Sequence, residues 1–206
     1  MSPNKKERGS HSMSAFAEGA TVLLRPLERS DLNPRYLGWL NDPEVTRYTE
    51  IGTFPSTSED LENYFRAITG SRNDVILAIV DKRSGQHVGN VKLGPIHWTH
   101  RSATLGILIG EKQFWGKGVG LEATRLMVEY GFGRLNLNRI DLGVFAEHEA
   151  AVRCYEKAGF KIEGRMREDL FQDGEYKDRL WMGLLRSEYQ PLRFEVNTEK
   201  TAGKRK

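Results

Sequence analysis

The chain has 206 residues, 29% of them charged, and a formal net charge of +3, which fits one domain with one core. Acidic and basic residues are interleaved, so the composition gives no support to a nucleic-acid footprint. No window holds the roughly 18 uninterrupted apolar residues of a membrane span and the N-terminus lacks a signal-peptide core, so we expect a cytoplasmic protein that does not act at a membrane.

Both ends of the chain are polar and show no apolar periodicity. Residues 1–18 are expected to be a disordered leader or a remnant of cloning. Residues 194–206, which end in TEKTAGKRK, are expected to be a mobile tail. This leaves residues 19–193 as the single predicted domain.

The domain begins with a short strand followed by helical segments. TVLLRPL (21–27) has the composition of a strand and is ended by its proline. Ser30 or Asp31 is a candidate cap for a first short helix, and Pro43 opens a second segment, PEVTRYT.

The next segment, SEDLENYFRAI (58–68), predicts a helix. Ser58 is the expected N-cap, and acidic residues follow in the first turn, where they complement the helix dipole. Helical spacing places four apolar residues on one face: Leu61, Tyr64, Phe65 and Ile68.

Three strands are predicted next, at 75–81, 87–93 and 102–110. The short connections between them imply antiparallel neighbours. A long helix then follows from about Gly118 to Leu135, because apolar residues recur there at helical spacing.

The C-terminal part alternates strands with one more helix. We expect a strand at 138–145, a helix at 149–159 ended by its glycine, and strands at 160–171 and 173–185. The order of elements predicts a mixed α/β (α+β) fold with a largely antiparallel sheet of about seven strands flanked by helices.

The only cysteine, Cys154, cannot form an internal disulfide, and no His/Cys cluster surrounds it to bind zinc. A reactive thiolate would need an electropositive setting, and Arg153 and Lys157 lie near it in sequence. A small apolar filler is the favoured interpretation.

Three glycines, Gly116, Gly118 and Gly120, precede the long helix. A dinucleotide-binding fingerprint would need a glycine at position 121, which is Leu121, so that motif is excluded. A P-loop is excluded as well, because Glu111 stands where its first glycine belongs.

What remains is a row of backbone N–H groups at the positive end of a helix, with the charge of Lys117 beside it. Such a loop favours a phosphate or pyrophosphate, and it offers no carboxylate or hydroxyl for a metal. The alternative is a helix entry whose glycines only permit close packing.

Several motifs together resemble the GNAT family of N-acetyltransferases over residues 21–190. They are the strand SATLGILIG, the loop QFWGKG, which fits Q-x-x-G-x-G, and the block A-x-x-x-Y-x-K-x-G-F at 151–160. The ending DGEYKDRLWMGLL (173–185) resembles the branch that includes ribosomal-protein alanine, spermidine and aminosugar acetyltransferases. The resemblance implies an acetyl-CoA-dependent enzyme, and members of this branch are often homodimers. No metal is expected, because the glycine loop offers no ligands for one.

The resemblance also implies where acetyl-CoA binds. Its pyrophosphate would lie against the backbone of residues 115–120, and its arm in a cleft where the strand at 107–109 splays from the strand at 140–144. The residues expected to contact it are Ile107, Leu108, Ile109, Gln113, Trp115, Gly116, Lys117, Gly118, Val119, Gly120, His148 and Tyr155.

Tyr155 matches the tyrosine that protonates the departing thiolate in many members, although it could instead only pack on the cofactor. Thr104 stands where relatives often have an acidic base, and His148 where they have an asparagine. Glu50 is therefore the first candidate for the catalytic base.

The resemblance places WLNDPEVTRYTE over the acceptor pocket, and Asp42, Glu50 and His97 are candidate substrate contacts. Asp42, Glu44, His97 and His100 are further candidates for the base. An acidic pocket mouth would attract a primary amine, which leaves a peptide N-terminus, a polyamine and an aminosugar open.

Two further points stay open at this level. Trp39 and Trp98 are expected in the core or the pocket wall. A non-catalytic acyl-CoA-binding sensor is the alternative function, because the strand lacks the usual acidic residue at Thr104.

Overall fold

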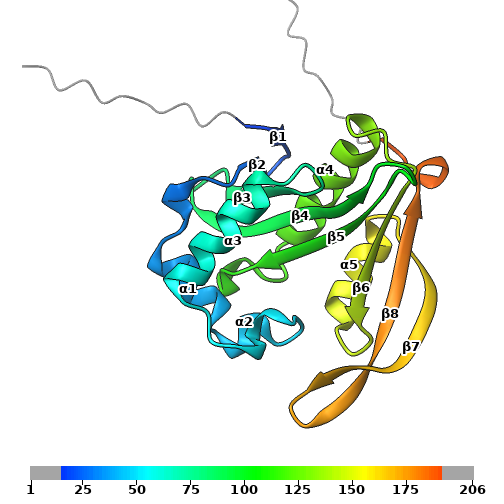
Figure 1. Ribbon diagram of the computed structural model, residues 1–206. Helices are drawn as coiled ribbons and strands as arrows, with labels where there is room; N and C mark the ends of the chain where they lie inside the picture. The colour runs from blue at the N-terminus through cyan, green and yellow to red at the C-terminus, as the bar shows by residue number, and fades with distance from the viewer. Residues whose placement is uncertain (1–14, 192–206) are drawn as a thin grey trace, which may run out of the picture.

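The computed structural model describes residues 15–191, which form one eight-stranded sheet with helices on both faces (Figure 1). The strands are β1 (Ala17–Glu18), β2 (Val22–Pro26), β3 (Val75–Asp81), β4 (His87–His97), β5 (Ser102–Ile109), β6 (Arg139–Phe145), β7 (Lys161–Gln172) and β8 (Glu175–Leu185). The helices are α1 (Pro34–Leu40), α2 (Pro43–Thr46), α3 (Ser58–Gly70), α4 (Val119–Gly133) and α5 (Glu149–Lys157).

The sheet order is β1-β2-β3-β4-β5-β6-β8-β7, and every neighbouring pair is antiparallel except β5 with β6. The prediction of a mixed, largely antiparallel α/β fold is therefore confirmed. The strand that the sequence did not predict is β1, which pairs Ala17 with Leu24.

The expected domain boundary after residue 18 is too late, since β1 and the hydrogen bond from Phe16 N to Leu24 O (2.7 Å) already belong to the sheet. The rest of the predicted leader, residues 1–14, and the predicted tail, 194–206, lie outside the described residues. Within the described part, no helix is long and apolar enough to cross a membrane.

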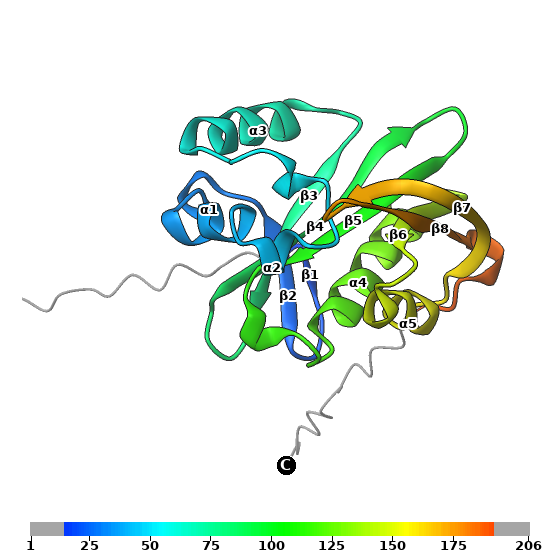
Figure 2. The same ribbon diagram turned by 90° about the horizontal axis from the view of Figure 1, so that it is seen from below.

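The helices divide between the two faces of the sheet. Figure 2 shows α1 and α3 on one side and α4 and α5 on the other. The larger apolar core, with Phe132 and Met127 of α4, fills the α4 side. A smaller core, with Tyr36 and Trp39 of α1 and Leu61 of α3, fills the opposite side. Each face is thus buried by its own set of helices.

Two helices begin at caps other than those predicted. Thr57, not Ser58, caps α3, because its hydroxyl accepts from Asp60 N while the Asp60 carboxylate accepts from Thr57 N. Asn33 caps α1, with its side-chain oxygen accepting from the amides of residues 35 and 36. Asp31 does not cap α1, because its carboxylate is hydrogen-bonded to Arg25 in the core.

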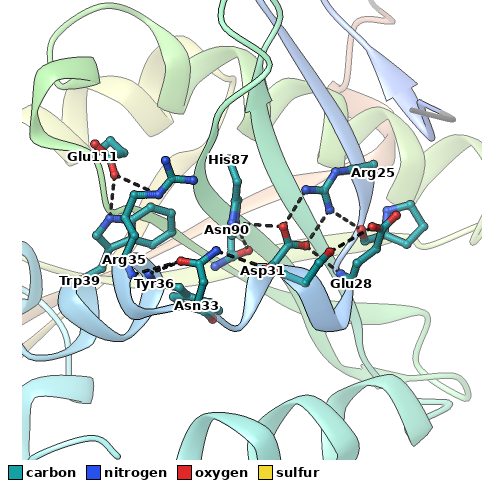
Figure 3. Close-up of polar contacts among 12 residues, drawn as sticks. Arg25, Glu28, Asp31, Asn33, Arg35, Tyr36, Trp39, His87, Asn90 and Glu111 are labelled. Atoms are coloured by element: carbon teal, nitrogen blue, oxygen red, sulfur yellow. Dashed lines mark hydrogen bonds and ion pairs between the residues drawn. The ribbon is translucent and has the colours of Figure 1, made fainter. Parts of the chain in front are cut away.

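That carboxylate is part of a buried polar cluster beneath α1 (Figure 3). Asp31 receives two hydrogen bonds of 2.7 Å from Arg25. His87 Nδ1 lies 3.6 Å from Asp31, and His87 Nε2 lies 3.0 Å from Asn90 Oδ1. All four side chains are buried, so the charges of Arg25 and Asp31 compensate each other out of contact with bulk water.

The central strands splay apart, as the family resemblance implied. β5 and β6 pair only over 102–104 and 139–141, where Thr104 Oγ1 donates to Asp141 Oδ1 at 2.9 Å. Beyond that point β5 continues along β4 as far as Ile109, while β6 continues along β8 as far as Phe145. A gap opens between the two strands (Figure 1).

Candidate active site

A cavity of about 1100 Å³ runs through this gap. On the side of α1 and α3 it is lined by Tyr36 and Tyr64, and at the gap by residues of β5 and β6 such as Ile107 and Val144. On the other side it reaches the N-terminal end of α4 and runs along α5 from Ala150 to Lys157. The cavity therefore connects the two faces of the sheet.

The glycine loop forms the cavity wall at the start of α4. Gly116 and Gly118 have φ angles of +70° and +82°, which side chains rarely adopt, and a Cβ at either position would meet no atom within 4 Å. Gly118 is the N-cap of α4, and no side chain caps the first amides of the helix. Trp115 Nε1 donates to Ile109 O (2.8 Å) and holds the loop against β5. This arrangement fits a phosphate.

Most residues predicted to contact acetyl-CoA line this cavity. They are Ile107, Leu108, Ile109, Trp115, Gly116, Gly118, Val119, Gly120, His148 and Tyr155. Gln113 and Lys117, which are both exposed, do not line it. Phe114 and Leu121 line it in addition, and their apolar character gave no sequence signal for that role.

Tyr155 lies on α5, half-buried, with its ring 6.0 Å from that of Phe160. Burial raises the pKa of its phenol well above the usual range, so the hydroxyl is protonated at neutral pH. A protonated phenol in the cavity wall is able to give a proton to a leaving group. Its neighbour Cys154 also lines the cavity, and burial raises the pKa of its thiol, which favours the unreactive form.

His148 stands at the start of α5, where its carbonyl accepts from the amides of Ala151 and Val152. Its ring stacks on Tyr48 at a centroid distance of 4.2 Å. Burial lowers the pKa of His148, so its ring is neutral at pH 7 and keeps one N–H donor.

Of the three predicted acceptor contacts, one lines the cavity and two do not. Glu50 lines the cavity, with its side chain 80% exposed and a carboxylate oxygen 3.3 Å from Arg179. Asp42 does not line the cavity, since its carboxylate caps α2 and pairs with Lys112 at 2.8 Å. His97 is outside it as well, because it lies at the far end of β4, opposite Ser102.

The other candidates for the base are also placed. Glu44 lines the cavity but pairs with Lys112 at 2.5 Å, and His100 is exposed in the turn after β4. Trp39 is in the core, where its indole N–H donates to Glu111 (3.1 Å; Figure 3). Trp98 is 46% exposed and belongs to neither core nor cavity wall, contrary to expectation.

The sequence suggested an acidic pocket mouth, but the cavity is lined by side chains of both charges. Its carboxylates are Glu44, Glu50 and Asp60, and its cationic side chains are Arg47, Lys92, Arg153, Lys157 and Arg179. Sequence reasoning missed Lys92 and Asn90, which the alternation of β4 places on one face two residues apart. In the described part of the chain, no group of three His, Cys, Asp or Glu side chains is arranged to hold a metal.

The splayed strands, with the glycine loop and Tyr155 at one cavity, form the arrangement expected for the family that the sequence resembles. Residues 21–161 match the family described as "Acetyltransferase (GNAT) domain". The chain therefore belongs to the GNAT acetyltransferase family and is an acyltransferase, which confirms the resemblance seen in the sequence.

Individual relatives are similar to this chain as well, some of them over most of its length. The spermidine N(1)-acetyltransferase of Escherichia coli K12 is 34% identical over 82% of this chain and 88% of that protein. The L-amino acid N-acetyltransferase of the same strain is 31% identical over 52% of this chain and 65% of that protein. The crystal structure of spermidine N-acetyltransferase from Vibrio cholerae in complex with CoA and spermine has a TM-score of 0.75 and 30% identity, and covers 82% of this chain and 98% of that one.

Proposed function

We propose that the protein transfers an acetyl group from acetyl-CoA to a primary amine within the cavity. The observation that carries this proposal is the continuity of the cavity, which joins the glycine loop and Tyr155 to a polar region beneath α1 and α3. Donor and acceptor can then meet at the gap between β5 and β6.

Acetyl-CoA supplies the acetyl group as a thioester. The backbone of Gly116 to Gly120 is proposed to bind its pyrophosphate, with Arg153 and Lys157 of α5 adding positive charge. Among the described residues, the edge of β5 from Leu105 to Leu108 that faces β6 has no strand partner, so its backbone is proposed to pair with the amides of an extended arm.

The amine is proposed to attack the carbonyl directly. A C–N bond forms, the C–S bond breaks, and the Tyr155 hydroxyl gives its proton to the thiolate. The attacking amine loses a proton to Glu50, directly or through water. Of the two predicted bases that line the cavity, Glu50 has the longer ion pair, 3.3 Å to Arg179 against 2.5 Å for Glu44 to Lys112.

The relatives make a polyamine the first acceptor to test, because two of them are named for spermidine. A peptide N-terminus and an aminosugar are the other acceptors in the panel, and the match to an amino acid N-acetyltransferase supports including free amino acids. All of these offer the same primary amine to the cavity.

The test is thiol release from acetyl-CoA in the presence of each amine, followed by mass spectrometry of the product. We expect release that depends on the amine and a product heavier by one acetyl group. A sensor module would bind CoA, as measured by calorimetry, but would release no thiol with any of the amines. That result would overturn the proposed function.

A further inference from the structure

Lys92 lies on the floor of the cavity on the side of α1 and α3, which we call the acceptor half. It is directly opposite Gly106 in β5 and Ile76 in β3, so the three positions share one face of the sheet. A Cβ on Gly106 would meet no atom within 4 Å, which means that open space adjoins the lysine stem. The Lys92 side chain is 31% exposed and lines the cavity.

An ion pair fixes the position of this lysine. Lys92 Nζ lies 2.8 Å from Asp74 Oδ1, and Asp74 Oδ2 accepts from the Ser71 hydroxyl at 2.7 Å. Asp74 itself does not line the cavity. Since an ammonium group has three N–H donors, the pair leaves Lys92 with donors for a ligand.

The carboxylates of the acceptor half are all engaged elsewhere. Glu44 pairs with Lys112 and Glu50 with Arg179, while Asp60 accepts from the backbone and hydroxyl of Thr57. Glu44 and Glu50 are thus each paired with one cation, and Asp60 keeps its charge but is held at the start of α3.

Two cations of the acceptor half, Arg47 and Lys92, keep hydrogen-bond donors for a ligand. Arg47 makes no ion pair with any described residue, and its guanidinium lies 5.3 Å from the centre of the Tyr48 ring. Lys92 has a single partner, Asp74. The acceptor half thus offers unsatisfied positive charge together with the side chains of Tyr36 and Tyr64.

We propose that Lys92 binds an anionic group, a carboxylate or a phosphate, on the acceptor. The preferred acceptor is then a primary amine that carries such a group at its far end, in place of a polyamine. This inference rests on the proposed acetyl transfer and narrows its acceptor class. Lys92 acts on specificity, because it binds the acceptor away from the reacting amine.

Matched acceptors test this directly. Glucosamine is compared with glucosamine 6-phosphate, and a dipeptide amide with the same dipeptide bearing a free carboxylate, with spermidine as the cationic reference. We measure kcat/KM with acetyl-CoA, and separately the Kd of each acceptor by calorimetry on the CoA-loaded protein. The anionic member of at least one pair is expected to be preferred about tenfold, and the pair that shows it distinguishes a phosphate from a carboxylate.

Variants assign the preference to Lys92. Lys92→Gln should raise KM for the anionic acceptor about tenfold with kcat nearly unchanged, and Lys92→Arg should restore most of the loss. Asp74→Asn should act in the opposite direction and tighten binding of the anion. The matched control is Lys82→Gln, because Lys82 is also ion-paired, to Glu18 at 2.6 Å, is 34% exposed, and lies outside the cavity.

The outcomes separate the two proposals. If an amine is acetylated but neither pair shows a preference, or the preference survives in Lys92→Gln, the role of Lys92 is overturned while acetyl transfer stands. If no amine is acetylated, yet calorimetry shows the anion preference and its loss in Lys92→Gln, acetyl transfer is overturned and the anion site stands. Tighter binding of spermidine than of every anionic acceptor would also contradict the inference.

Discussion

At the scale of single residues, the protonation states are set by burial. The Tyr155 phenol and the His148 and His87 rings are all kept neutral because desolvation disfavours their charged forms. The side chains of Tyr155 and His148 line the cavity, where the neutral phenol and the neutral imidazole can each donate a hydrogen bond.

Replacing Tyr155 by phenylalanine removes the proposed acid and keeps the ring that packs near Phe160. We expect kcat to fall by about 10²–10⁴-fold, the usual range for loss of general acid catalysis. The Kd for CoA should stay within about twofold. Steady-state kinetics and calorimetry measure the two quantities, and unchanged turnover would remove the acid role.

The buried His87 predicts a dependence of stability on pH. Its native pKa is lowered, mainly by burial, from the ordinary value of about 6.5, so below about pH 6.5 the unfolded chain takes up a proton that the native state refuses. The free energy of unfolding should therefore fall by up to about 1.4 kcal/mol per pH unit as the pH drops from 6.5 toward the native pKa.

Urea unfolding at pH 7, 6 and 5 measures this slope. His87→Gln should make it shallower without abolishing it, because His148 shifts in the same direction. The exposed His97→Gln serves as the control for loss of a histidine elsewhere in the chain. A His87→Gln slope equal to that of the wild type would contradict the assignment.

At the scale of elements, the local sequence was sufficient to predict the bounds of those strands and helices that depend mainly on their own residues. β3 has the bounds predicted, and α4 begins within one residue of the expected start. β4 runs on to His97, beyond the predicted end at residue 93, because a shift in register lets the strand continue past Pro95. The place where β5 and β6 part could not be derived from local patterns, since pairing between strands is non-local.

The same limit applies to the candidate site. The glycine loop and Tyr155 were found because they belong to contiguous motifs. Asp42 and His97 were expected from proximity in sequence, and the structure takes them elsewhere. Lys92 was missed because nothing in its own segment indicates which face of the sheet borders the acceptor half.

The entry to α4 allows a paired prediction on two glycines. Gly118→Ala forces alanine into φ near +82°, which should cost about 1–2 kcal/mol of stability, and it adds a methyl where the pyrophosphate is proposed to bind. Gly120→Ala places its Cβ at ordinary distances of 3.9 and 4.0 Å from Ile109 and Cys154.

We therefore expect Gly120→Ala to keep or increase stability, by up to about 1 kcal/mol, while Gly118→Ala decreases it. Urea unfolding distinguishes the two signs. CoA affinity, measured by calorimetry, should fall in Gly118→Ala. Equal stability of both variants would show that the positive φ imposes no cost.

At the scale of the whole molecule, the site depends on both layers of helices and on the sheet between them. A ligand that binds only the native fold must therefore stabilise the whole cooperative unit. CoA at about 100 times its Kd should raise the free energy of unfolding by about 2.7 kcal/mol. Thermal unfolding with and without CoA measures this shift, and an unshifted midpoint at that concentration would contradict binding at the native cavity.

The passage of the cavity through the gap between β5 and β6 has a consequence for kinetic order. Because the glycine loop and Lys92 lie on different sides of the sheet, acetyl-CoA and the acceptor can be bound at the same time. Initial-rate plots should then give intersecting lines, typical of a ternary complex, where a ping-pong mechanism gives parallel ones. A bisubstrate compound, with the sulfur of CoA linked to the acceptor amine, would occupy the passage from end to end and compete with both substrates.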